Sequence, residues 1–149
     1  MIEINNLTSI FLNKEFIKRV GKEVLAGEKK KKNTNISVAF VSPAMIKKAN
    51  SKYRNKNKIT DVLAFPSFAK GYGGQARFLE KDSGLGEVII CPSAVKKNAK
   101  IFGLSFKKEL SKVLIHGVLH LLGYNHESSK KKASEMEGKQ NYYLSKIKA

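Results

Sequence analysis

The segment 105–122, SFKKELSKVLIHGVLHLL, constrains the fold of this chain more than any other part of its sequence. Its apolar residues fall on nearly every face of a helix, and they are Leu110, Val113, Leu114, Ile115, Val118, Leu119, Leu121 and Leu122. A helix that is apolar all round belongs in the middle of a domain, where other elements cover each of its faces. Ser105 is a suitable N-cap for this helix, and Gly123 is a suitable residue to end it.

The rest of the chain alternates between segments typical of strands and segments typical of helices. Short apolar strands are expected at 2–5, 36–41, 61–65 and 87–91. Apolar residues at intervals of three and four predict helices at 11–25, 42–53, 92–102 and 128–147, besides the central one. This alternation predicts an α/β (α+β) fold, in which a small mixed sheet of about four strands packs with about five helices.

The length of 149 residues fits a single domain spanning 1–149. Residues 67–85 are rich in glycine and show no helical or strand periodicity, so neither a helix nor a strand is predicted there. Unstructured loops longer than about 12–15 residues are uncommon in compact domains and often serve a function. We therefore expect a loop there that belongs to a functional site or lacks a fixed structure.

The chain is strongly basic, with 29 Lys and Arg, 12 Asp and Glu and a formal net charge of +17. Such an excess favours binding to polyanions, because neutralised phosphates release their counterions. Arg occurs only at positions 19, 54 and 77, so a compositional bias toward Lys is the competing explanation. The run Lys29–Lys32 is expected to be a solvated turn, since blocks of like charge usually stay exposed.

The N-terminal sequence MIEINNLTSIF has no basic segment followed by an apolar one, so we expect no secretory signal. No apolar run approaches the roughly 20 residues of a membrane helix. The single cysteine, Cys91, lies in an apolar strand and is expected to be a buried small hydrophobe. These features predict a cytoplasmic protein without a membrane association, and we expect it to be a monomer.

All three histidines of the chain lie in the segment HGVLHLLGYNH, at positions 116, 120 and 126. His116 and His120 are four residues apart on the central helix, so their side chains lie on one face. Gly123 can adopt a positive φ and reverse the chain, which brings His126 back toward the other two. Three imidazoles would occupy three corners of a tetrahedron and leave the fourth open, as in a catalytic zinc site. We predict that His116, His120 and His126 bind one Zn²⁺ at the end of this helix, rather than being ordinary core or surface histidines.

These offsets equal those of the metzincin peptidases, whose pattern is H-E-x-x-H-x-x-G-x-x-H. In those peptidases the glutamate after the first histidine is the general base. Here that position holds Gly117, which can neither accept nor deliver a proton. If this chain were a peptidase of that type, it would therefore lack the general base.

The histidine segment resembles the signature of the YbeY family, metal-dependent endoribonucleases of ribosomal RNA maturation. Three further segments match motifs of that family: Asn50 with Tyr53-Arg54, the segment TDVLAFP at 60–66, and the segment GEVIIC at 86–91. Two positions depart from the family pattern. Asn125 stands where Asp is usual, which removes a carboxylate beside the candidate site, and Ala64 replaces the usual Ser.

The resemblance implies a single-strand-specific endoribonuclease that acts in maturation of the small-subunit rRNA 3′ end and in ribosome quality control. RNA and the small ribosomal subunit would be its partners, and Arg54, His116 and His120 would be its catalytic residues. Arg54 is suited to this role because a guanidinium forms a charge-assisted fork with a phosphate. Its alternative role is that of a cation at the C-terminal end of a helix dipole.

The sequence predicts the roles of several other charged residues less specifically. Asp61 and Glu87 are either groups behind the metal site or structural partners of Arg54, and we favour the structural role. Lys130–Lys132 either guide RNA toward the metal or form a solvated helix start.

Two other functions stay open at this point. One is a zinc-dependent hydrolase of another substrate class, such as a peptidase. The other is a non-enzymatic ribosome-associated protein with a structural zinc. A fourth protein ligand on the metal would favour the second of these, and an open coordination position would oppose it.

Overall fold

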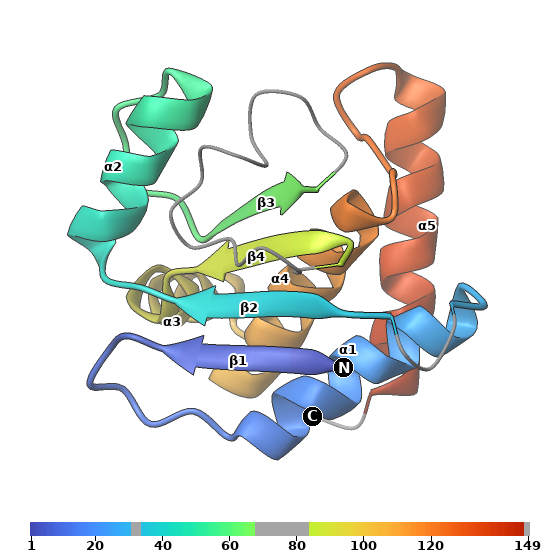
Figure 1. The fold of residues 1–149 in the computed structure, drawn as a ribbon, viewed down its shortest axis with the longest axis horizontal. Helices are drawn as coiled ribbons and strands as arrows, with labels where there is room; N and C mark the ends of the chain where they lie inside the picture. Colours follow the sequence, from blue (N-terminus) through green and yellow to red (C-terminus); the bar gives the residue numbers. More distant parts are fainter. Residues whose placement is uncertain (31–33, 68–83, 148–149) are drawn as a thin grey trace.

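A four-stranded mixed sheet forms the centre of the computed structural model, which describes residues 1–30, 34–67 and 84–147. The strands are β1 (Ile2–Asn6), β2 (Ile36–Phe40), β3 (Val62–Pro66) and β4 (Gly86–Ile90), and their order across the sheet is β1-β2-β4-β3. β1, β2 and β4 are parallel, whereas β3 is antiparallel to β4, with Ala64 opposite Val88. The sequence-based expectation of a small mixed sheet is confirmed (Figure 1).

Five helices accompany the sheet in the described part of the chain, as expected: α1 (Lys14–Gly27), α2 (Pro43–Arg54), α3 (Pro92–Phe102), α4 (Phe106–Leu121) and α5 (Lys130–Lys146). Helix α4 contacts β3, β4, α1, α3 and α5, so it is the central helix that its all-round apolar sequence predicted. Its buried apolar residues include Ile115, Val118 and Leu119, each 0% exposed. Burial of a side chain of this size contributes about 1.5–3 kcal/mol, which explains why this helix occupies the core.

The two faces of the sheet support separate apolar clusters. Val38, Phe40, Val88 and Ile90 belong to the larger cluster, which includes the apolar residues of α4 and α1. The residues that alternate with them, such as Ala39 and Ile89, belong to a smaller cluster with Ile46 and Ala49 of α2. Helix α2 therefore packs against the face of the sheet opposite α4.

Local capping signals set several helix boundaries as predicted. The Ser105 Oγ accepts from the Lys108 N–H at 3.0 Å, and the Ser42 Oγ accepts from the Met45 N–H at 3.3 Å. Gly103 ends α3 with φ 67°, in the left-handed region. Ser129 is the N-cap of α5, so this helix begins at Lys130 rather than at the expected position 128.

The prediction of a helix from position 11 was wrong at its start. Asn13 is the N-cap, and its side chain accepts from the Phe16 N–H at 3.1 Å, so α1 begins at Lys14. Phe11 precedes the helix and is 88% exposed. Its apolar side chain extended the apolar pattern, so the predicted helix began too early.

The expected third strand was 61–65, whereas the observed β3 begins at Val62 and ends at Pro66, a residue that is tolerated because β3 is an edge strand. Of the glycine-rich segment at 67–85, residues 68–83 lie outside the described part of the chain, as do residues 31–33 of the lysine-rich turn. Among the helices of the described chain, none is long and apolar enough to cross a membrane.

Candidate metal centre

The end of α4 reverses the chain and brings the histidines together. Leu122 is the C-cap, and Gly123 follows with φ 100°, a conformation that favours glycine. The Gly123 N–H donates to the His120 carbonyl at 3.0 Å, and the Tyr124 N–H donates to the Leu119 carbonyl at 3.1 Å. These two bonds form a Schellman motif, as the position of Gly123 predicted. The chain then returns along the helix end and carries His126 to the side of His120.

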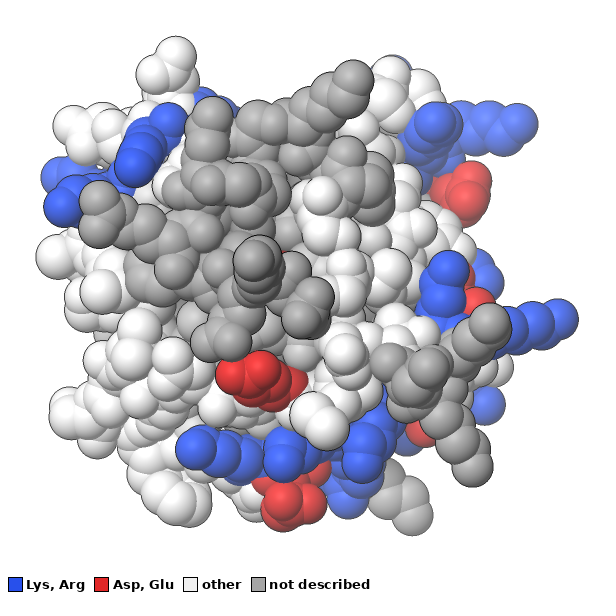
Figure 2. Space-filling view, in the orientation of Figure 1, with Lys and Arg blue, Asp and Glu red and all other residues white. Residues whose placement is uncertain are grey.

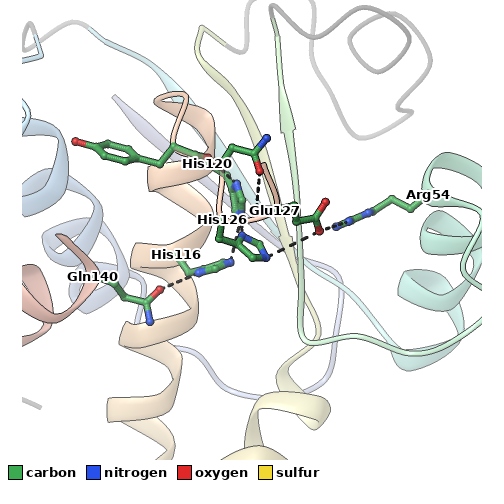
Figure 3. A network of polar contacts seen from close by, with 8 residues as sticks. Arg54, His116, His120, His126, Glu127 and Gln140 are labelled. Carbon is green, nitrogen blue, oxygen red and sulfur yellow. Dashed lines mark hydrogen bonds and ion pairs between the residues drawn. The ribbon is translucent and has the colours of Figure 1, made fainter. Parts of the chain in front are cut away.

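The three imidazoles converge on one point (Figure 3). The Nε2 atoms of His116 and His120 are 3.1 Å apart, and the Nδ1 of His126 lies 3.1 Å from the Nε2 of His120. One ring nitrogen of each histidine lies within 4.8 Å of those of the other two. Zinc bonds of 2.0–2.1 Å in a tetrahedral site place ligand nitrogens about 3.3–3.4 Å apart. The spacing of these nitrogens therefore fits a zinc ion.

The other ring nitrogens of His116 and His120 are held by hydrogen bonds. The Nδ1–H of His120 donates to the backbone carbonyl of Tyr124 at 2.9 Å. The Nδ1 of His116 lies 2.8 Å from the Oε1 of Gln140, a side chain of α5. Because both partners are acceptors, each Nδ1 carries the proton and each Nε2 presents a lone pair toward the convergence point. Such outer hydrogen bonds are how proteins orient imidazole ligands and select their tautomer.

Burial keeps these two imidazoles neutral. It lowers the pKa of His120 to about 4, helped by the neighbouring His116 and His126. Burial also lowers the pKa of His116. A metal binds the neutral form of imidazole, so both rings are in the ligand form at neutral pH.

Arg54 lies across the cleft from the histidines, at the C-terminal end of α2 (Figure 3). Its Nη2 pairs with the Oε1 of Glu127 at 2.9 Å, and the same oxygen lies 3.9 Å from the Nε2 of His126. The hydrogen bond and charge of Arg54 lower the pKa of the Glu127 carboxyl. Both side chains are partly exposed, 36% for Arg54 and 58% for Glu127, so solvent and ligands can reach this ion pair.

The three histidines, Arg54 and Glu127 line one cleft of ≈ 440 Å³. Asp61 of the segment before β3 and Asn125 of the loop after α4 also line it. Two separate stretches of the chain, 54–66 and 116–127, therefore form one concave site that polar groups line.

Some outer residues differ from the sequence-based expectation. The ion-pair partner of Arg54 is Glu127, not Asp61 or Glu87. Asp61 accepts instead from the Asn98 Nδ2 at 3.4 Å, and Glu87 is buried in β4 with 1% exposure. Cys91 is buried, as expected.

Asn125 does not contact a histidine ring through a hydrogen bond in the described structure. Its Oδ1 accepts from the Glu127 N–H at 2.8 Å, which shapes the loop that carries His126. The sequence pattern did not single out Gln140 or the carbonyl of Tyr124. A glutamine on an amphipathic helix carries no signal of its own, and every residue has a carbonyl.

A mixed four-stranded sheet with a three-histidine cleft at the end of its central helix defines a small α/β protein with a candidate metal centre. Residues 3–148 match the family model described as Endoribonuclease YbeY. The chain belongs to this family.

Individual relatives agree with this assignment. The chain is 42% identical over 115 residues to the endoribonuclease YbeY of Thermotoga neapolitana, covering 77% of this chain and 68% of the relative. It is 36% identical over 138 residues to that of Persephonella marina, covering 93% and 86%. The solution structure of a Thermotoga maritima protein superposes with a TM-score of 0.64 at 32% identity, covering 99% of this chain and 89% of the other.

Proposed function

We propose that this chain is a zinc-dependent endoribonuclease that cleaves single-stranded RNA. Its role would be maturation of the small-subunit rRNA 3′ end and ribosome quality control. The observation that carries the proposal is one cleft, in a member of the endoribonuclease YbeY family, that combines three converging imidazoles with a guanidinium.

The candidate ligands are His116, His120 and His126. Imidazole nitrogens favour zinc over magnesium or calcium. The group found in the described residues comprises these three histidines and no fourth His, Cys, Asp or Glu, which supports an open coordination position. When bound there, zinc would act as a Lewis acid toward a phosphoryl oxygen and lower the pKa of water.

Arg54 is suited to hold the scissile phosphate. A guanidinium has five N–H donors, and the ion pair with Glu127 engages Nη2. A phosphate entering the cleft therefore finds donors on the remaining nitrogens, or displaces Glu127 from an ion pair that solvent already reaches. The substrate is oriented between this fork and the histidine cluster.

The surface beside the cleft is suited to an RNA backbone. Between Pro43 and Thr60 the chain has no Asp or Glu and carries Lys47, Lys48, Lys52, Arg54, Lys56 and Lys58. Figure 2 shows blue side chains and no red ones at the upper left, where Figure 1 places α2. On the opposite side, over α5, blue and red are mixed. The bound RNA strand is therefore expected to leave the cleft along α2, and not over Lys130–Lys132, which are exposed at the start of α5.

The packing of α4 opposes the peptidase alternative. A Cβ at Gly117 would lie 2.6 Å from the Cγ1 of Val88, so the position of the peptidase glutamate has no room for a side chain. The three-histidine group opposes a purely structural zinc, since such sites use four protein ligands.

We also propose that residues 1–149 act as one domain, as a monomer in the cytoplasm. Support for the cellular location comes from the RNA substrate: ribosomal RNA is processed where ribosomes assemble.

The deciding experiment is RNA cleavage by purified protein, before and after removal of metal by a chelator and after return of zinc. A single strand and a duplex of the same sequence serve as substrates. We expect cleavage of the single strand only, lost with chelator and restored by zinc. Cleavage that survives complete metal removal would contradict the proposal.

Arg54→Lys tests the phosphate fork. A hydrogen bond to a charged group contributes about 1.5–3 kcal/mol, so kcat/KM should fall about 10–100-fold while the fold is retained. Arg19→Lys is the matched control, because Arg19 lies on α1 outside the cleft. Equal activity of the two variants would show that Arg54 does not hold the phosphate.

Salt dependence tests the role of the lysines. The logarithm of RNA affinity should fall linearly with the logarithm of salt concentration, with a slope of about −0.7 per phosphate contact for a single strand. A flat response would mean that the positive charge is compositional.

A further inference from the structure

A carboxylate far from the cleft in sequence is linked to both half-buried histidines, His116 and His120. Glu28 is the C-cap residue of α1, and its side chain is 11% exposed. Its Oε1 accepts from the Tyr124 hydroxyl at 2.6 Å. Its Oε2 accepts from the Tyr143 hydroxyl and from the Lys139 ammonium, the latter at 3.2 Å. One carboxylate therefore joins α1 to the loop after α4 and to α5.

The charge state of this cluster is well defined at neutral pH. Burial alone would raise the pKa of Glu28, but hydrogen bonds from Tyr124, Tyr143 and Lys139 outweigh it and lower the pKa on balance. Burial and the bond to Glu28 raise the pKa of Tyr124 to about 12, so its hydroxyl remains a donor. An ionised acceptor thus faces three donors.

The first link to the metal centre runs through Tyr124. The hydroxyl of this residue is held by Glu28, while its backbone carbonyl accepts from the Nδ1–H of His120 at 2.9 Å. Fixing the side chain at one end restrains where the carbonyl lies at the other. The carbonyl in turn selects the tautomer that leaves the Nε2 of His120 free for a metal.

The second link runs through α5. Lys139 and Tyr143, both bonded to Glu28, flank Gln140 in the sequence of this helix. Gln140 Oε1 is the acceptor for the Nδ1 of His116 at 2.8 Å. Anchoring this turn of α5 to Glu28 sets the position of the amide that orients His116.

We propose that Glu28 is a positioning residue of the metal centre, acting through Tyr124 on His120 and through α5 on His116. The inference rests on the proposed metal site, but not on RNA cleavage. A carboxylate suits this position because Glu28 accepts on both oxygens and its charge strengthens all three hydrogen bonds. Glutamine has one acceptor oxygen and would direct its NH₂ at a hydroxyl or at the Lys139 ammonium.

Two variants test the proposal. Glu28→Gln removes the charge and one acceptor, and Tyr124→Phe removes only the hydroxyl and keeps the backbone carbonyl. Glu137→Gln is the matched control, since Glu137 is an exposed carboxylate on α5 and loses the same charge. Zinc affinity is measured by competition with a chelator of known affinity. Loss of an outer partner typically weakens metal binding 10–100-fold, so we expect about tenfold for either variant and no change for the control.

A second readout needs neither zinc nor activity. The ¹⁵N chemical shifts of the imidazoles in zinc-free protein report the tautomer of each ring. In the natural sequence His120 should show a single tautomer with the proton on Nδ1, and in both variants its signals should move toward a tautomer average. Combining the two substitutions should weaken zinc binding less than the sum of their separate effects, because they break one shared link.

The outcomes separate positioning from simple structural support. If Glu28→Gln lowers the unfolding temperature but keeps the zinc affinity and the His120 tautomer, Glu28 only ties α1 to α5 and the proposal is wrong. If Glu28→Gln does not fold, Tyr124→Phe decides by the same two readouts. Failure of the natural protein to bind zinc would refute the metal site, while the tautomer measurement would still decide whether Glu28 orients His120.

Discussion

Replacing Gly117 with alanine tests how closely α4 packs against the sheet beside the candidate metal ligands. A Cβ at this position would lie 2.6 Å from the Cγ1 and 3.1 Å from the Cγ2 of Val88, and 3.4 Å from the Cγ2 of Val62. Carbon atoms in contact normally lie about 3.5–4.0 Å apart. Val88 is 0% exposed in β4, between two other strands, so its side chain has little room to turn away from an added methyl group.

Two opposing terms set the expected stability change. Alanine is favoured over glycine inside a helix by about 1 kcal/mol. Overpacking of a filled core costs about 1–3 kcal/mol. Gly117→Ala should therefore change the free energy of unfolding by between nothing and a loss of about 2 kcal/mol. Because the neighbouring residue is His116, displacement of the helix should also weaken zinc binding.

Gly138→Ala provides the matched control. Gly138 lies within α5, and a Cβ there would meet nothing within 4 Å. This substitution should stabilise the protein by up to about 1 kcal/mol. Urea denaturation of both variants measures the difference, expected to be about 1–3 kcal/mol in the free energy of unfolding.

A third variant identifies the clash as the cause. In a Val88→Ala background the nearest methyl groups are gone, so Gly117→Ala should become stabilising relative to that background. If Gly117→Ala stabilises the natural protein as much as Gly138→Ala does, α4 does not pack closely against Val88 at this position. The packing reason for excluding a glutamate at position 117 would then fail with it.

Three further predictions concern the metal centre. His120→Ala should remove bound zinc, and metal analysis that still finds one zinc per chain would show that the ligands are misassigned. Burial lowers the pKa of His120 from 6.5 to about 4, so the unfolded chain binds more protons than the folded one in this range. The zinc-free protein should therefore lose stability as the pH falls from about 6.5 to 4, and thermal unfolding across this range should show a weaker dependence in His120→Ala. Asn125→Asp should keep its bond from the Glu127 N–H and add a negative charge to the cleft, so titration calorimetry should find tighter zinc binding; identical affinities would mean that the departure from the family pattern is neutral.

The sequence by itself determined the features that depend on neighbours along the chain. The all-round apolar pattern of 105–122 identified the central helix, because each face of a helix can be read from residues three and four apart. The separation of His116 from His120 placed two imidazoles on one face, and Gly123 supplied the positive φ that returns His126. The strand and helix segments followed from the same local periodicities, and the errors fell at ends such as Phe11, where an apolar side chain lies outside its helix.

The tertiary structure alone decided which distant groups meet. Arg54 and Glu127 pair although 73 residues separate them, and Glu28 reaches Tyr124 across 96 residues. β4 lies between β2 and β3 in the sheet, which brings the segment before β3 beside the end of α4. Glu28, Gln140 and the backbone carbonyl of Tyr124 form no recognisable sequence pattern, because their roles depend on which groups the tertiary packing places beside them. The convergence of the three histidines could thus be predicted from local spacing, whereas the residues that orient them depend on how three helices and a loop pack together.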